Sequence, residues 1–217
     1  MNHQPSEAVE MYLRTVLELE EEGVTALRAR LSERLGLSAP AVSEGVARLE
    51  QAGFAVLGAD RTITLTELGR ERAEHVMRKH RLAERLLVDV LGLEREHVHE
   101  EACRWEHVIS DRVEAKLLEF LGNPTTSPYG NPIPGSAPDG HEPVSLADAA
   151  EGAVTIRYFS EHLQRDHDVI QQLDAGRIWS GTTVEVARGP GSVTLEHDGE
   201  QVELDAEEAK LVFVTPA

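Results

Sequence analysis

Two side chains of types that bind metal ions interrupt the apolar face of a long predicted helix. The helix runs from Thr66 to about Leu91, and at about 100° of rotation per residue His80 and Glu84 fall in the middle of its apolar stripe. An isolated charge buried among aliphatic side chains is very costly, so a carboxylate in that position needs a partner. The pattern therefore predicts that His80 and Glu84 face other polar groups inside the protein.

The next predicted helix, over residues 94–121, carries a second set of donor groups within or at the edge of its apolar stripe: His99, Cys103, Glu106 and His107. Gly92 joins the two helices, so a helical hairpin brings both sets to similar heights, facing each other. Nitrogen, oxygen and sulfur donors on one interhelical seam indicate a divalent metal site. The alternatives are structural core histidines, or a salt-bridge network that includes Arg81 and Arg85.

Met11 is a candidate sulfur donor for the same site. A first helix is predicted from about Val9 to Glu22, and Met11 projects away from its apolar stripe. A methionine is more often a core residue, but this one is either exposed or reaches another part of the protein. A thioether together with Cys103, Glu106 and His107 gives mixed S, N and O ligation, which suits iron(II), cobalt, nickel or zinc better than calcium or magnesium.

The charge balance bears on the partners of the chain. The 217 residues have a formal net charge of −18, which argues against a protein that coats nucleic acid. The excess lies mostly in residues 123–217, with 16 acidic and 5 basic residues. A single cysteine indicates a reducing compartment, and neither a secretory signal nor an apolar run of about 20 residues is found. We therefore expect a soluble cytoplasmic protein that does not act at a membrane.

A proline-rich stretch divides the chain into a helical part and a β-rich part. Six of the ten prolines lie within residues 123–143, which predicts an ordered loop or linker. After Val144 apolar residues alternate with polar ones, and turns are predicted at residues 189–191 and 198–199. The fold class predicted is mainly α with β, built from more than one domain.

The segment before Thr66 has the layout of a winged helix-turn-helix. A helix over residues 27–35, a turn at Gly36, a helix capped by Ser38 and a hairpin over residues 54–65 follow one another. The capped helix begins with small residues, as entry into a major groove requires, and directs four residues outward: Ala41, Ser43, Glu44 and Arg48. Three further residues are placed to hold flanking phosphates: Arg28, Arg30 and Arg61.

Two observations keep other interpretations of this segment open. A plain three-helix unit used for protein contacts has the same spacing. Glu44 repels phosphate, and it either accepts a hydrogen bond from a cytosine amine or points to solvent.

Four longer motifs resemble the diphtheria toxin repressor / iron-dependent regulator family: EMYLRT at 10–15, MRKHRLAER at 77–85, CRWEH at 103–107 and GNPIPG at 130–135. The resemblance covers nearly the whole chain. It implies a homodimeric, iron(II)-activated repressor that binds palindromic operators in double-stranded DNA and controls iron homeostasis genes. It also implies three domains: a winged helix-turn-helix over 1–74, a helical dimerisation and metal-binding domain with the proline-rich linker over 75–142, and a small SH3-like β-barrel over 143–217.

The resemblance also implies specific site residues, with two metal sites in each protomer. A primary site is implied at Met11, Cys103, Glu106 and His107. An ancillary site is implied at His80, Glu84 and His99, joined by Glu161 and Gln164 of the SH3-like domain. An anion pocket is implied at Arg81, Ser127 and Asn131. A DNA-facing set is implied at Arg28, Ser38, Pro40, Ser43, Arg48 and Arg61. Ala41 and Glu44 stand where relatives often carry Thr and Gln.

Fe(II) is the expected ion, with Co(II), Ni(II), Mn(II) and Zn(II) as substitutes. A manganese-sensing repressor is the alternative within the family, although the soft donors Met11 and Cys103 argue against manganese. Two other classes are compatible with these residues, a metal-dependent hydrolase and a metal buffer. A hydrolase needs an open coordination position, a catalytic base and a substrate pocket, and the sequence indicates none of these. We therefore expect no enzyme activity.

Overall fold

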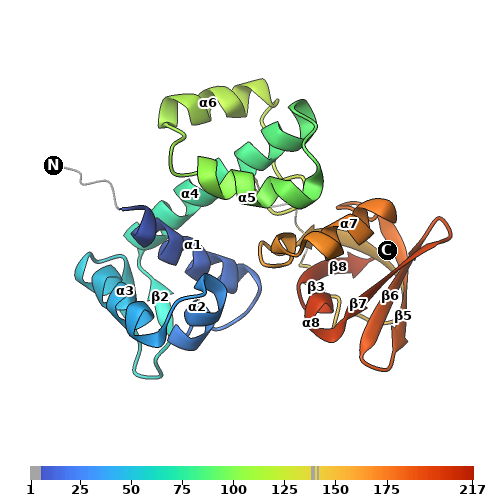
Figure 1. The fold of residues 1–217 in the computed structure, drawn as a ribbon, viewed down its shortest axis with the longest axis horizontal. Helices are drawn as coiled ribbons and strands as arrows, with labels where there is room; N and C mark the ends of the chain where they lie inside the picture. The colour runs from blue at the N-terminus through green and yellow to red at the C-terminus, as the bar shows by residue number, and fades with distance from the viewer. Residues whose placement is uncertain (1–5, 138–139, 141) are drawn as a thin grey trace. The chain divides into compact units, whose positions relative to one another are not determined.

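The computed structural model describes residues 6–137, 140 and 142–217, and the chain divides into two units within one long helix. The first unit ends at Arg78 and the second begins at Lys79, both in α4 (Glu67–Arg85; Figure 1). Among the described residues, no helix combines the length and the apolar character needed to cross a bilayer.

The first unit has the predicted order of helix, helix, helix and two-stranded ribbon. Its elements are α1 (Glu7–Glu21), α2 (Arg28–Leu35), α3 (Ala39–Gln51), β1 (Ala55–Leu57), β2 (Ile63–Leu65) and the beginning of α4. β1 and β2 pair antiparallel, with Val56 opposite Thr64. Thr66 caps α4 as expected, since its hydroxyl accepts a hydrogen bond from the Gly69 amide at 3.1 Å.

Packing of the first unit fixes which face of α3 is exposed. Val42, Val46 and Leu49, which are spaced at i, i+4 and i+7 and so share one face of the helix, are fully buried. At the start of α3, the Ser38 hydroxyl accepts from the Ala41 amide at 3.5 Å. The Tyr12 hydroxyl of α1 donates to the Ala41 carbonyl at 3.2 Å, which ties α1 to the first turn of α3.

The second unit combines the end of α4 with helices and a sheet. Its helical elements are the π-helix η1 (Leu86–Val90), α5 (Arg95–Trp105), α6 (Asp111–Phe120), the 3₁₀-helix η2 (Leu163–Arg165), α7 (His167–Ala175) and α8 (Ala206–Ala209). Its strands are β3 (Val144–Ser145), β4 (Gly152–Phe159), β5 (Thr183–Gly189), β6 (Ser192–His197), β7 (Glu200–Asp205) and β8 (Val212–Pro216).

The prediction of a single helix over residues 94–121 is wrong. The chain forms two helices there, α5 and α6, with a break at residues 106–110. The Ser110 hydroxyl accepts from the Val113 amide at 3.4 Å and starts a new helix. The break shifts the helical phase, and in the new helix Val113 is exposed while Glu114 is buried. It also leaves Glu106 and His107 in a turn rather than inside a helix.

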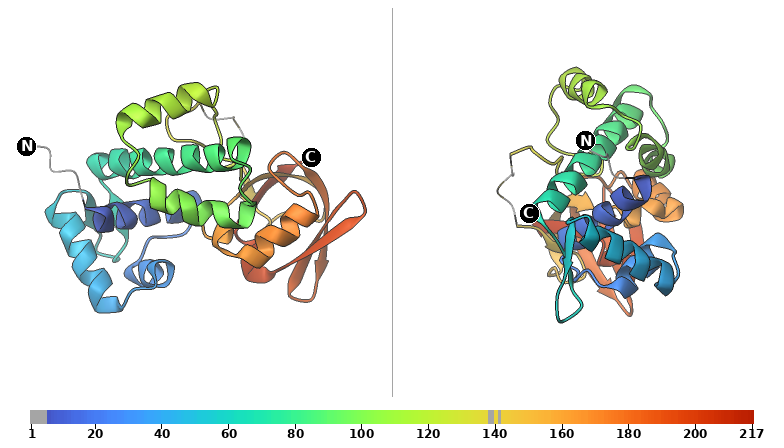
Figure 2. Two further views of the ribbon diagram at one scale, coloured as in Figure 1. Left: turned by 45° about the horizontal axis from the view of Figure 1, so that its top comes forward. Right: turned by 90° about the vertical axis from the view of Figure 1, so that its left-hand side faces the viewer.

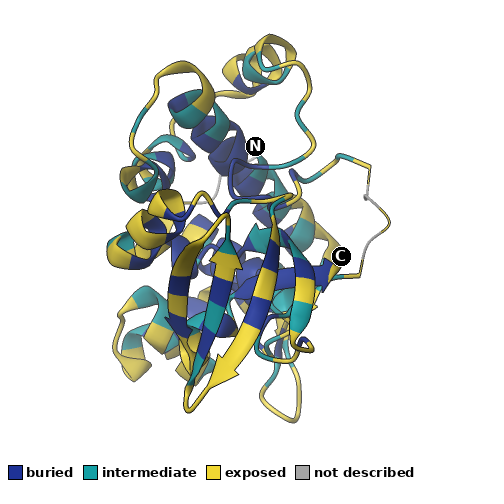
Figure 3. Cartoon of the chain, turned by 90° about the vertical axis from the view of Figure 1, so that its right-hand side faces the viewer, coloured by how far each residue is buried: buried dark blue, intermediate teal, exposed yellow. Residues whose placement is uncertain are grey.

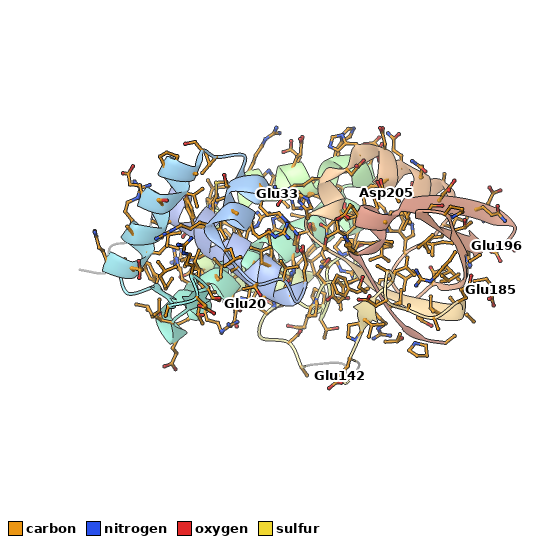
Figure 4. The ribbon with its side chains drawn as sticks, turned by 90° about the horizontal axis from the view of Figure 1, so that it is seen from below. Glu20, Glu33, Glu142, Glu185, Glu196 and Asp205 are labelled. Carbon is orange, nitrogen blue, oxygen red and sulfur yellow. The ribbon has the colours of Figure 1, made fainter. Side chains whose placement is uncertain are left out.

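The sheet of the second unit is strongly curved and has the strand order β3-β8-β4-β5-β6-β7 (Figure 2). Burial alternates along β5, β6 and β7, which Figure 3 shows as blue and yellow bands. Acidic residues occupy several of the outward positions, and Glu185 lies directly opposite Glu196 (Figure 4). Both predicted turns are present, and the second has positive φ at Asp198 and Gly199 (51° and 85°), as a tight hairpin requires.

The proline-rich segment is an ordered loop in its first half. Thr126 and Pro132 form an isolated β-bridge, and Tyr129, Asn131 and Ile133 are buried. The loop is therefore part of the interior of the second unit rather than a simple linker. Pro138, which belongs to the same predicted segment, lies outside the described residues.

One apolar core runs through the whole second unit. It joins Ala83 and Leu87 of the α4–η1 segment and Val98 of α5 to residues of the sheet such as Ile156 and Phe159. The Arg95 guanidinium lies 4.2 Å from the centre of the Trp179 ring, and the Tyr129 hydroxyl donates to the Arg95 carbonyl at 2.6 Å. The helices and the sheet are thereby held together as one body.

Gly45 provides a test of the packing of α3. A Cβ added at Gly45 meets the Tyr12 ring at 2.3 Å, closer than real Cβ atoms approach. We expect Gly45→Ala to lower the free energy of unfolding by about 1–3 kcal/mol through overpacking, although alanine is the better helix former. Urea denaturation of the full chain measures it. Ser43→Ala on the exposed face of α3 is the control, and equal stability of both variants would contradict the packing described.

Candidate metal centre

Four side chains from three separate segments meet in the interior of the second unit. His80 and Glu84 lie one turn apart on α4, His99 lies on α5, and Glu161 follows strand β4. Each offers one nitrogen or oxygen atom, and these atoms all lie within 4.8 Å of one another. All four residues are buried. We call this group the four-residue site.

The distances show that two imidazoles and two carboxylates share a small space. His80 Nε2 lies 2.9 Å from Glu84 Oε1 and 3.3 Å from Glu161 Oε2. His99 Nδ1 lies 3.4 Å from Glu161 Oε2 and 3.8 Å from Glu84 Oε1. The two histidine rings meet edge to face with centroids 5.0 Å apart.

Burial and neighbouring charge act against each other on these groups. Burial by itself lowers the pKa of His99, but the Cys103 thiol and the carboxylates of Glu161 and Glu84 outweigh it and raise the pKa to about 10. Burial by itself raises the pKa of Glu161, but the positive charges of His80 and Arg81 hold the pKa of that carboxyl well below its usual range. The site therefore contains carboxylate charge that must be balanced by a cation.

The donor set fits a divalent transition-metal ion. Within the described residues, Glu84 Oε2 is buried and accepts no hydrogen bond, which is unusual for a carboxylate oxygen. Imidazole nitrogen and carboxylate oxygen are ligands that iron, manganese, cobalt and zinc all accept. A bound ion would satisfy this oxygen and supply the positive charge that protonated imidazoles otherwise provide.

A second cluster lies next to the four-residue site and consists of Cys103, Glu106 and His107. The Cys103 sulfur and a Glu106 oxygen lie within 4.8 Å of each other and of a His80 ring nitrogen. His107 Nε2 lies 3.2 Å from Glu106 Oε1. Met11 belongs to the first unit, where its side chain is 44% exposed on α1, as its position outside the apolar stripe predicts. That Met11 joins the second cluster stays a prediction.

The residues expected to form an anion pocket are buried and have hydrogen-bond partners inside the second unit. Arg81 donates to Glu161 Oε1 at 3.0 Å and also to the Pro132 carbonyl. Asn131 Oδ1 accepts from the Ser127 hydroxyl at 3.2 Å and from the Gln164 amide at 3.0 Å. Arg81 thus has an internal carboxylate as its partner. Gln164 is fully buried, and its amide oxygen has no hydrogen-bond partner among the residues that the structure describes. Its place among the metal ligands stays a prediction.

The residues expected to face DNA lie at the surface of the first unit. Arg28 is half-buried and the others are exposed: Ser38, Pro40, Ser43, Arg48 and Arg61. Glu44 is exposed too, and its carboxylate lies 3.6 Å from the Arg48 guanidinium one turn away. This ion pair reduces the repulsion that Glu44 alone exerts on a phosphate. The DNA contacts themselves stay predictions.

Two features of the site were not found from the residue pattern. Arg165 Nε lies 3.4 Å from His99 Nε2, and no periodic signal marks Arg165 because it lies in the short helix η2. His80 takes part in both groups of ligands, since its Nδ1 lies 2.6 Å from Glu106 Oε2. Helical spacing places a side chain on a face, but it does not say what each ring nitrogen contacts.

The fold and the site define a class: a winged helix-turn-helix protein with a buried cluster of side chains that could hold a metal ion. Three family descriptions match successive parts of the chain. The "Iron dependent repressor, N-terminal DNA binding domain" matches residues 5–62, the "Iron dependent repressor, metal binding and dimerisation domain" matches 66–135, and the "Diphteria toxin repressor SH3 domain" matches 139–215.

Individual proteins give the same result. The iron-dependent repressor IdeR of Mycobacterium tuberculosis is 50% identical over 222 residues, covering 96% of each chain. The diphtheria toxin repressor of Corynebacterium diphtheriae is 47% identical over 208 residues, covering 91% of this chain and 92% of its own. The solved structure of a manganese-dependent transcriptional repressor in complex with manganese superposes with a TM-score of 0.82 at 29% identity, covering 96% of this chain and all of the other.

The chain belongs to the diphtheria toxin repressor / iron-dependent repressor family. The family and the fold class expected from the sequence, with a helix-turn-helix domain and a C-terminal SH3-like domain, are confirmed. The relatives are named as repressors rather than enzymes, in agreement with the expectation that the chain is not an enzyme.

Glu84→Gln tests the four-residue site because it preserves shape and removes one charged ligand. We expect the variant to fold, while the increase in the free energy of unfolding caused by Co(II) falls by about 1.4 kcal/mol or more, equivalent to tenfold weaker binding. Denaturant unfolding with and without the ion measures this. Glu185→Gln, an exposed change on β5, is the control. An undiminished effect of Co(II) on Glu84→Gln would contradict the assignment.

Proposed function

We propose that this protein is an iron(II)-dependent transcriptional repressor that binds palindromic operators as a metal-activated dimer and controls iron homeostasis genes. The observation that carries the proposal is the four-residue site itself, in a chain that also presents a helix-turn-helix. The site holds buried nitrogen and oxygen donors, and one of its carboxylate oxygens, Glu84 Oε2, accepts no hydrogen bond from the described residues. Relatives about half identical along nearly the whole chain are named iron-dependent repressors, which supports iron as the signal.

The exposed face of α3 is the part proposed to enter the major groove. The small side chains at its N-terminal end allow the backbone to approach DNA, and Ser43 and Arg48 are directed outward. Arg28 and Arg61 are proposed to hold flanking phosphates, which position the protein without reading sequence.

Two metal sites are proposed in each protomer. His80, Glu84, His99 and Glu161, with Gln164, would hold one ion through nitrogen and oxygen atoms. Cys103, Glu106 and His107, with Met11, would hold the other through a set that includes sulfur. Soft sulfur donors favour iron(II) over manganese(II) at the second of these sites. The manganese alternative is kept because a relative of similar fold is a manganese-dependent repressor.

The proposed activation is a change in conformational freedom. Met11 lies on α1 of the DNA-binding unit and Cys103 lies on α5, so an ion held by both would restrict the orientations that the two units adopt. A ligand that favours the DNA-competent orientation raises the DNA affinity by linkage. A tenfold increase needs only about 1.4 kcal/mol of differential affinity.

Dimerisation is proposed to use an exposed apolar set in the second unit, within or near the stretch that matches a dimerisation domain. Its members are Val90, Leu91, Val108, Val113 and Phe120. Phe120 at the end of α6 is 67% exposed, which is unusual for a large aromatic side chain. Pairing two copies over this set would remove it from water.

The first test is metal-dependent DNA binding. We expect fluorescence anisotropy with a palindromic duplex to show binding with anaerobic iron(II) and tenfold or weaker affinity with chelator, with manganese(II) compared in parallel. Met11→Ala and Cys103→Ala should each lose the response to iron, while Glu196→Gln keeps it. Equal affinity of the wild-type protein with iron(II) and with chelator would refute metal activation.

The second test concerns the dimer. Phe120→Asp places a charge in the apolar set, so we expect it to sediment as a monomer at concentrations where the wild-type protein is a dimer, and to lose affinity for the palindrome. Lys116→Glu, an exposed change on the same helix, should leave the dimer intact. A dimeric Phe120→Asp protein would show that pairing uses another surface.

A further inference from the structure

We propose that His80 is a positioning residue that couples the four-residue site to the second cluster through Glu106. This inference rests on the proposed metal binding, not on DNA recognition. The two nitrogens of the His80 ring face different groups: Nε2 lies 2.9 Å from Glu84 Oε1, and Nδ1 lies 2.6 Å from Glu106 Oε2. The ring is fully buried, so water does not compete for either nitrogen.

The chemistry of imidazole makes the two contacts interdependent. A neutral ring has one protonated and one unprotonated nitrogen, and only the unprotonated nitrogen ligates a metal ion. If Nε2 serves the four-residue site, the proton must be on Nδ1, where it is donated to Glu106. A carboxylate behind a ligating histidine fixes its tautomer and ring orientation and makes it a better ligand. Glu106 therefore supports His80 as a ligand.

The same contact positions Glu106 for its own role. Its Oε2 is directed to His80, while its Oε1 lies 3.2 Å from His107 Nε2 in the second cluster. The side chain is buried and follows the end of α5, where the break before α6 lets it turn inward. With Oε2 engaged by His80, Oε1 is the oxygen that Glu106 presents to the second cluster. His80 thereby sets which oxygen is offered and in which direction.

The consequence is positive coupling between the two sites. An ion at the four-residue site would fix the orientation of the His80 ring and, through their hydrogen bond, that of the Glu106 carboxylate. An ion at the second cluster would fix Glu106 and, through the same bond, the His80 ring. Coupling of binding free energies is reciprocal, so each site should bind more tightly when the other is filled. Removal of a carboxylate behind a metal-binding histidine typically weakens metal binding about ten- to a hundredfold.

The experiment isolates the four-residue site by using Met11→Ala as a background that weakens the other site. Co(II) affinity is measured by competition with a chelator in this background, without DNA. Adding Glu106→Gln should lower the affinity of the remaining site about tenfold or more. Adding Glu100→Gln, the same change at an exposed position of α5 outside both groups of ligands, should leave it unchanged. Thermal unfolding without metal verifies that each variant is folded.

A spectroscopic readout distinguishes positioning from a general structural effect. With zinc bound, NMR of the ¹⁵N-labelled His80 ring should show a protonated Nδ1 with a strongly downfield proton, and this proton should move upfield in Glu106→Gln. Unchanged Co(II) affinity on adding Glu106→Gln, or an unprotonated Nδ1 in the zinc-bound protein, would overturn the proposal. Loss of DNA binding by any variant leaves it standing, because neither measurement involves DNA.

Discussion

The burial of carboxylates in a dry interior is the constraint on which the second unit depends. Glu84, Glu106 and Glu161 are all buried, and a buried charge is tolerated only when opposite charge and hydrogen bonds surround it. His80, His99 and Arg81 supply these partners, and every one of them is buried as well. Such a cluster is poorly suited to stability alone, but it is well suited to exchanging protons for a metal ion. Glu84 Oε2, which is buried and accepts no hydrogen bond from the described residues, is suited to the same exchange.

This constraint explains why the sheet is an integral part of the unit. Glu161 reaches the histidines only because α5 packs against α7 and η2, and because a shared apolar core joins the helices to strand β4. The loop that contains Tyr129 and Asn131 packs in the same region. It is connected to the end of β4, because the Asn131 amide donates a hydrogen bond to the Phe159 carbonyl at 2.9 Å. The segment that follows β4 thus contributes Glu161, which is both a candidate metal ligand and the carboxylate partner of Arg81.

The distribution of charge reconciles an acidic protein with DNA binding. Most of the net charge of −18 comes from residues 123–217, where 16 acidic residues stand against 5 basic ones, among them Glu185 and Glu196, which lie opposite each other on β5 and β6. The exposed face of α3 instead carries small and hydroxyl side chains and an arginine, and Glu44 is paired with Arg48. The total charge of a chain is therefore a poor guide to the electrostatics of one face, since interactions between exposed charges fade within about 10 Å at moderate salt.

The sequence by itself determined the features that follow from local periodicity and capping. Ser38 and Thr66 mark helix starts, Val42, Val46 and Leu49 mark the inner face of α3, and the spacing of His80, Glu84 and His99 placed them on facing helices. Glu161 was assigned only by family resemblance, because a loop residue has no period. The tertiary structure alone decided the break at residues 106–110, the contact between His80 and Glu106, and the internal carboxylate partner of Arg81. These three features depend on how segments far apart in the sequence pack together. The periodicity of one segment shows which of its faces is buried, but not which other segment packs against that face.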